Sequence, residues 1–102
     1  MKDIYQIIEI VRLRPQMYIG KEKLSTLASY LRGAHFALGI NEIKEYPDFM
    51  GFHNWVREEK YKLSPLSVGY ETTILEQTNG DEKKGLELFF ELIVEYRNHE
   101  RE

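Results

Sequence analysis

The residue types that most often act as metal ligands are sparse in this chain and are not arranged in metal-binding patterns. Cysteine is absent, and none of the three histidines, His35, His53 and His99, has a second histidine three or four positions away. His35 and His53 both fall on the apolar faces of predicted helices, where they could meet in space. We expect half-buried side chains bonded to backbone groups or tyrosine hydroxyls, and we predict no metal site.

Side chains suited to nucleophilic or acid–base catalysis are present but poorly placed. None of the serines lies in a G-x-S-x-G turn. Paired glutamates such as Glu87 and Glu91 fall on polar helix faces, whereas a catalytic pair needs one carboxyl whose pKa is raised by apolar burial. We therefore expect a protein that is not an enzyme and that uses no cofactor.

Tyrosine is the one residue type in excess, with seven copies, and several copies lie beside acidic residues. A small helical protein cannot bury all of these rings, and exposed tyrosines are common in protein-binding surfaces. A surface of tyrosines and carboxylates suits a partner protein that carries arginine and lysine. The candidate protein-binding residues are Tyr46, Asp48, Glu58, Glu59 and Tyr61.

A cluster of basic residues lies within residues 12–23 and supports an alternative function. Arg12, Arg14 and Lys21, together with Tyr18, could contact the phosphate of a small ligand or nucleotide. Glu9 and Glu22 dilute the positive charge of this region. The alternative to a protein-binding module is therefore a small-ligand or nucleotide-binding module.

Composition narrows the class of protein further. The chain has 102 residues, of which 42% are hydrophobic and 30% charged, which is typical of a single globular domain spanning residues 1–102. A net charge of -3 argues against nucleic acid as a partner. The chain has no apolar run long enough for a membrane span and no signal-peptide pattern, so we expect a cytoplasmic location and no membrane partner. Gly33 and Ala37 would allow close approach of a second copy, so both monomer and homodimer stay open.

Apolar periodicity predicts helices in the first half of the chain. Residues 3–13 carry apolar side chains at helical spacing, and Asp3 and Gln6 match a capping box. Pro15 should end this helix, after which Met17 and Ile19 are expected to insert beneath it before a turn at Gly20. Residues 24–38 predict a second helix capped by a glycine at position 39.

The second half predicts three more helices. Residues 47–61 form a helix whose expected inner face includes Phe49, Phe52 and His53, widened by Met50 and Trp55. Residues 67–78 fit a helix better than a strand, although a strand stays open. Residues 81–99 carry apolar side chains over much of the helix circumference, as expected for a central helix. The predicted fold is an all-α bundle of about five helices.

Residues 8–20, which end in RPQMYIG, resemble the N-terminal segment of gyrase B-type ATPases. In those enzymes, a Glu-x-x-x-Asn helix and an Asp-x-Gly-x-Gly segment complete the ATP site. Neither pattern occurs in this chain, so the resemblance is local and does not predict ATPase activity.

A second resemblance extends over nearly the whole chain. The RPQMYIG segment is followed by Leu-x-Gly at 31–33, by Phe-x-x-Phe-x-x-Trp-Val at 49–56, by a Gly-Tyr pair at 69–70 and by an apolar run at 86–92. This order is similar to that of small bacterial proteins regarded as immunity proteins of polymorphic toxin systems. The resemblance implies a non-catalytic antidote that binds a toxin domain. Because this chain is acidic, a basic toxin domain would suit it as a partner. It assigns no functional residue, because the matching positions are mostly core or turn positions.

Overall fold

The computed structural model describes residues 2–99, and every regular element in this range is helical. The elements are α1 (Ile4–Leu13), α2 (Pro15–Ile19), α3 (Leu24–Ile40), η1 (Phe49–Gly51), α4 (Phe52–Asn54), η2 (Trp55–Lys60), α5 (Tyr70–Gln77) and α6 (Glu82–His99). The predicted all-α bundle is therefore confirmed, and the strand left open for residues 67–78 is wrong. Because η1, α4 and η2 follow one another without a break, they form one irregular helix over residues 49–60, where the third helix was predicted.

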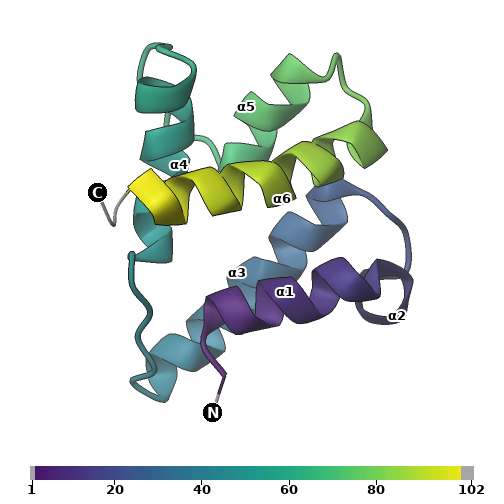
Figure 1. The fold of residues 1–102 in the computed structure, drawn as a ribbon, viewed down its shortest axis with the longest axis vertical. Helices are drawn as coiled ribbons and strands as arrows, with labels where there is room; N and C mark the ends of the chain where they lie inside the picture. The colour runs from purple at the N-terminus through teal and green to yellow at the C-terminus, as the bar shows by residue number, and fades with distance from the viewer. Residues whose placement is uncertain (1, 100–102) are drawn as a thin grey trace.

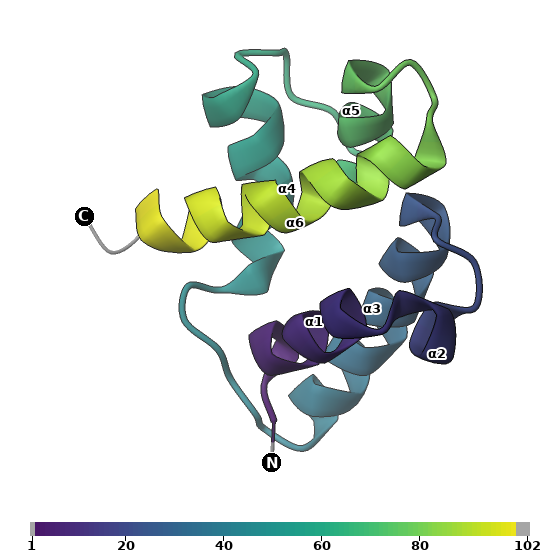
Figure 2. The ribbon, with the colours of Figure 1, turned by 45° about the vertical axis from the view of Figure 1, so that its right-hand side comes forward.

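The last helix, α6, is central to the bundle. In Figures 1 and 2 it crosses the middle of the molecule, with α4 and α5 on one side and α1 and α3 on the other. It contacts both α3 and α5. Phe89 and Leu92 are fully buried, and Leu86, Ile93 and Tyr96 are nearly so. The broad apolar surface of this segment thus explains its central position.

The N-terminal helix pair follows local signals in the sequence. The Asp3 carboxylate accepts the Gln6 backbone N–H, and the Gln6 side chain accepts the Asp3 N–H, so the predicted capping box is confirmed. Pro15 ends α1 and begins the short α2, and Gly20 makes the following turn with φ +74°. Ile19 inserts into the core as expected, but the expectation for Met17 is wrong because this side chain faces solvent.

The end of α3 lies beyond the predicted glycine cap. The helix continues through Gly39 to Ile40, and the residue with positive φ is Glu42, at 58°. Its N–H bonds to the carbonyl of Gly39, and the Ile43 N–H bonds to that of Leu38, which is the hydrogen-bond pattern of a Schellman motif. Ile43 supplies the apolar contact of this motif because it packs against the core, whereas Ile40 is exposed.

The irregular helix over residues 49–60 begins as a 3₁₀ turn and ends as a π-helix. Pro47 lies outside it, and Asp48 caps it by accepting the Met50 N–H. Since residues three apart eclipse in a 3₁₀ turn, Phe49 and Phe52 both face inward while Met50 faces solvent. The expectation that Met50 widens the inner face is therefore wrong, whereas the burial of Trp55 is confirmed.

An aromatic cluster centred on Phe52 joins this irregular helix to α5 and α6. The Phe52 ring is fully buried, and its centroid lies 5.2 Å from that of Tyr70 and 5.5 Å from that of Phe89. It also packs against Phe49, Trp55 and Tyr96. Such ring pairs contribute beyond their buried area, so this cluster fixes the surface around Phe49 and Tyr70 rigidly.

Candidate functional site

The five residues predicted to bind a partner protein lie at the two ends of the irregular helix. Tyr46 and Asp48 are exposed just before its start. Glu58 and Glu59 are exposed near its end, and Tyr61 follows as its C-terminal cap. The structure thus separates the candidate surface into two parts.

The part at the end of the helix is mostly engaged with the chain itself. The Glu59 carboxylate lies 3.2 Å from His99 Nε2. Tyr61 packs partly buried against the core, and burial raises the pKa of its hydroxyl. Of these three residues, Glu58 is the one left exposed without an ion pair within residues 2–99.

The part at the start of the helix borders an apolar groove of about 520 Å³. Exposed apolar side chains line it from three segments: Phe36 on α3, Met50 on η1 and Val68 before α5. Phe36 and Met50, which both line this groove, are each 71% exposed. We call the cavity lined by Leu31, Arg32, His35, Phe36, Phe49, Met50, His53, Ser67, Val68, Gly69 and Tyr70 the α3–η1 groove.

Two buried polar atoms of side chains that line the α3–η1 groove have no hydrogen-bond partner within residues 2–99. The Tyr70 hydroxyl is one, although the residue is only 7% exposed, and the other is His53 Nδ1. His53 Nε2 lies 3.1 Å from the Leu66 carbonyl oxygen, so it carries the proton and Nδ1 is left as an acceptor. Burial raises the pKa of the Tyr70 hydroxyl, which therefore stays a donor at physiological pH.

The rim of the α3–η1 groove next to Asp48 contains a second carboxylate. Glu45 accepts the Phe49 backbone N–H at 3.0 Å, and its carboxylate lies 2.9 Å from His35 Nε2. The expectation of half-buried histidines is confirmed for both His35 and His53. His35, however, pairs with a carboxylate and not with a backbone group or a tyrosine.

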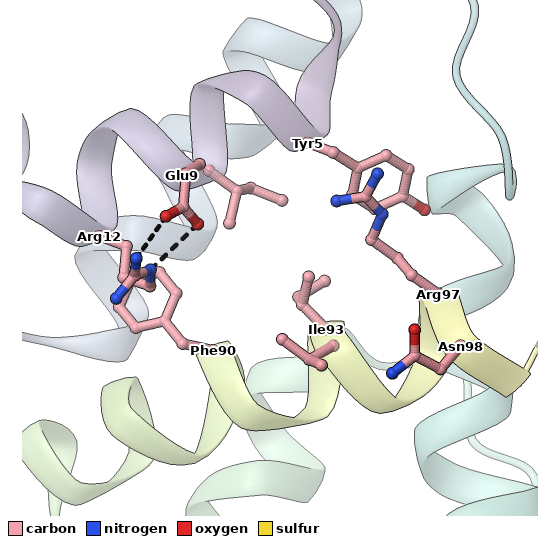
Figure 3. A pocket seen from close by; sticks show the side chains of 9 residues that line it. Tyr5, Glu9, Arg12, Phe90, Ile93, Arg97 and Asn98 are labelled. Atoms are coloured by element: carbon pink, nitrogen blue, oxygen red, sulfur yellow. Dashed lines mark hydrogen bonds and ion pairs between the residues drawn. The ribbon is translucent and has the colours of Figure 1, made fainter.

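The residues of the alternative ligand site do not share one cavity. Arg12 lines a cleft of about 230 Å³ between α1 and α6, and its guanidinium is held by Glu9, as Figure 3 shows. This ion pair lowers the pKa of the Glu9 carboxyl. Arg14, Tyr18 and Lys21 are exposed on and around α2 and do not line this cleft.

The other end of the α1–α6 cleft holds a cation that the sequence did not single out. The Arg97 guanidinium lies over the Tyr5 ring, 4.4 Å from its centroid, and forms no ion pair within residues 2–99 (Figure 3). Tyr5 itself is fixed because its hydroxyl donates to the Pro47 carbonyl at 2.5 Å. Arg97 therefore braces α6 against α1 through a cation–π contact.

The sequence does not predict most of the α3–η1 groove, because the residues that line it come from separate segments. One signal was available: Phe36 lies off the apolar stripe that Leu27, Leu31 and Leu38 form on α3. A single exposed aromatic residue is common on protein surfaces, so this signal gains meaning only from the other apolar side chains that line the groove. The exposure of Met50 depends on the 3₁₀ start of its helix, which the sequence does not reveal.

Comparisons of the chain with protein-family models, with curated proteins and with solved structures give no match. Within residues 2–99, no helix is both long and apolar enough to span a bilayer. The likeness to immunity proteins consequently rests on the sequence motifs alone.

Proposed function

We propose that this protein is a non-catalytic binding module that holds a segment of another protein in the α3–η1 groove. The observation that carries the proposal is the pair of apolar side chains, Phe36 and Met50, each 71% exposed, along a groove of about 520 Å³. Apolar side chains gathered on one exposed surface are typical of protein interaction sites. A partner that covered them would remove this area from water, which is the main driving force for association.

Charge defines the chemistry of the proposed partner. Asp48 places an exposed carboxylate at one rim of the groove, beside the largely buried side chain of Glu45, whereas Arg32 on the groove wall is ion-paired with Glu71. The segment that fits is therefore an apolar one flanked by lysine or arginine.

The class of partner that we favour is a basic toxin domain, which the protein would neutralise by binding. This step rests on the resemblance of the sequence motifs to immunity proteins and on the net charge of -3. An inhibitor of this kind requires a rigid surface of complementary shape and charge and no catalytic group.

The proposal is tested by capturing partners from native lysate with two matched double variants. Phe36→Glu with Met50→Glu places charge in the groove, and Leu13→Glu with Met17→Glu places it on similarly exposed apolar residues elsewhere. We expect one stoichiometric protein to be captured by the wild type and by the control, but not by the groove variant. Equal capture by both variants would rule out the groove as the docking surface.

The identity of the captured protein tests the proposal that the chain neutralises a toxin domain. Expressed alone, it should arrest growth of its host, and co-expression of the wild-type chain should restore growth. Co-expression of the groove variant should not. If the captured protein is not toxic, the proposed antidote function is wrong, and the proposal that the chain is a protein-binding module stands.

A further inference from the structure

One histidine and two carboxylates, of residue types that can bind a metal, lie close together at the rim of the α3–η1 groove. His35 Nε2, a Glu45 carboxylate oxygen and an Asp48 carboxylate oxygen all lie within 4.8 Å of one another. His35 comes from α3, Glu45 from the loop after it, and Asp48 from the cap of η1. Residues 41–48 are not helical, so the path of this loop brings the three side chains together.

Contacts outside the cluster orient each of the three side chains. The Phe49 backbone N–H donates to Glu45 Oε2 at 3.0 Å, and the Met50 N–H donates to Asp48 Oδ1 at 3.0 Å. The His35 ring is held edge-on against the Phe49 ring, with centroids 5.5 Å apart. Each backbone bond uses one oxygen of its carboxylate. Backbone N–H groups that hold the ligating carboxylates in this way are typical of built metal sites.

We propose that His35, Glu45 and Asp48 form a binding site for Zn²⁺. An imidazole nitrogen with two carboxylate oxygens is a ligand set that zinc accepts, whereas Ca²⁺ and Mg²⁺ prefer oxygen ligands alone. The side chains of His35 and Glu45 are 20% and 5% exposed, and Asp48 is exposed, so the ion would enter from the side of Asp48. Water would complete the coordination.

Binding of zinc would affect the protonation of His35 and would link two elements of the fold. Zinc would coordinate His35 Nε2, so a proton on this nitrogen moves to Nδ1 if the ring is neutral and leaves to solvent if the ring is protonated on both nitrogens. The ion would then join α3 directly to the start of η1. Since both elements line the α3–η1 groove, zinc would fix the distance between two of its walls.

The test is a titration of the full chain, purified without a polyhistidine tag, with ZnCl₂ in a calorimeter. CoCl₂ serves as a spectroscopic probe, because visible d–d bands report the geometry around the ion. We expect one equivalent to bind saturably and to raise Tm. His35→Gln and Asp48→Asn should each weaken binding by more than about tenfold. Asparagine keeps the helix cap at position 48, so the second variant remains folded.

His99→Gln is the control, because the exposed His99–Glu59 pair is the other histidine–carboxylate contact within residues 2–99. Its affinity for Zn²⁺ should equal that of the wild type. The proposal is overturned by the absence of saturable binding, by unchanged binding in both His35→Gln and Asp48→Asn, or by loss of binding in His99→Gln.

Discussion

The carboxylate of Glu82, the first residue of α6, caps the start of α3 by bonding to Ser25. Its Oε1 accepts the Ser25 backbone N–H at 2.9 Å, and its Oε2 accepts the Ser25 hydroxyl at 2.6 Å. Lys23, at the N-cap position of α3, provides no side-chain hydrogen bond to the helix start. A residue 57 positions away therefore satisfies a backbone donor that a local cap would normally satisfy, and it ties the central helix to α3.

Glu82→Ala should lower the free energy of unfolding by ~1–2 kcal/mol at pH 7, because it leaves the Ser25 N–H without a partner. The hydrogen bonds from Ser25 lower the pKa of the Glu82 carboxyl below its ordinary value of 4.5. The stabilisation is thus complete above pH 4.5 and is lost as pH falls through the lowered pKa. Urea unfolding at pH 7 and at pH 3 measures both effects.

Glu87→Ala on the exposed face of α6 is the control for this prediction, and it should change stability by less than about 0.5 kcal/mol. A difference between Glu82→Ala and the wild type that persists unchanged at pH 3 would contradict the capping role of the charged carboxylate.

Glu42→Gly should raise the free energy of unfolding by about 0.5–1 kcal/mol, since a residue with a Cβ is strained at φ 58° and glycine is not. Lys44→Gly, at an exposed position with φ outside that region, should lower stability or leave it unchanged. Thermal unfolding of the two variants side by side measures the difference. Loss of stability in Glu42→Gly would mean that this side chain makes a contact worth more than the strain.

Tyr70→Phe should leave the stability of the free protein unchanged or raise it by up to about 1 kcal/mol, because the lost hydroxyl is buried and has no hydrogen-bond partner among the residues that the structure describes. Tyr5→Phe is the matched comparison. It removes a hydroxyl that donates to the Pro47 carbonyl at 2.5 Å, so it should cost ~1–2 kcal/mol. Equal costs in chemical unfolding would show that the Tyr70 hydroxyl is satisfied by an ordered water.

Arg57→Met should destabilise the fold by ~1–3 kcal/mol. Arg57 is a buried cation whose guanidinium donates to the Ser64 carbonyl at 2.7 Å and to the carboxylate of Glu76 at 3.2 Å. It also approaches the hydroxyl of the fully buried Thr73, at 3.4 Å, so its loss removes a partner from a buried hydroxyl.

Arg12→Met is the control for Arg57, because its ion pair with Glu9 is exposed and should contribute less than about 0.5 kcal/mol. Urea midpoints at low and high salt separate the two cases, since salt screens the exposed pair much more than the buried network. Equal midpoints for the two variants would contradict a structural role for Arg57.

The features that the sequence predicted are those set by neighbouring residues. The Asp3–Gln6 capping box and the break at Pro15 depend on local contacts, and both occur as expected. The end of α3 was misplaced because Gly39 satisfies the same pattern as a true cap. The bonds at Glu42 depend on how Ile43 packs against the core, which no local pattern encodes.

The candidate site could be predicted only in part, because its geometry depends on segments that meet in space. Asp48 and Tyr46 were singled out for their chemistry, and they border the start of the irregular helix that lines the groove. The proximity of His35 to Glu45 arises from the path of the loop between α3 and η1. Sequence periodicity carries no information about that path.

The most direct test of the α3–η1 groove as the docking surface is a comparison of ¹H–¹⁵N spectra of the protein with and without its captured partner. We predict that the largest amide shifts fall in residues 31–36, 49–53 and 66–70, which line the groove or adjoin it. Shifts confined to residues 58–61, or to residues 12–21, with the groove segments unchanged, would contradict docking in the α3–η1 groove. The binding surface would then lie in the region whose amides shift.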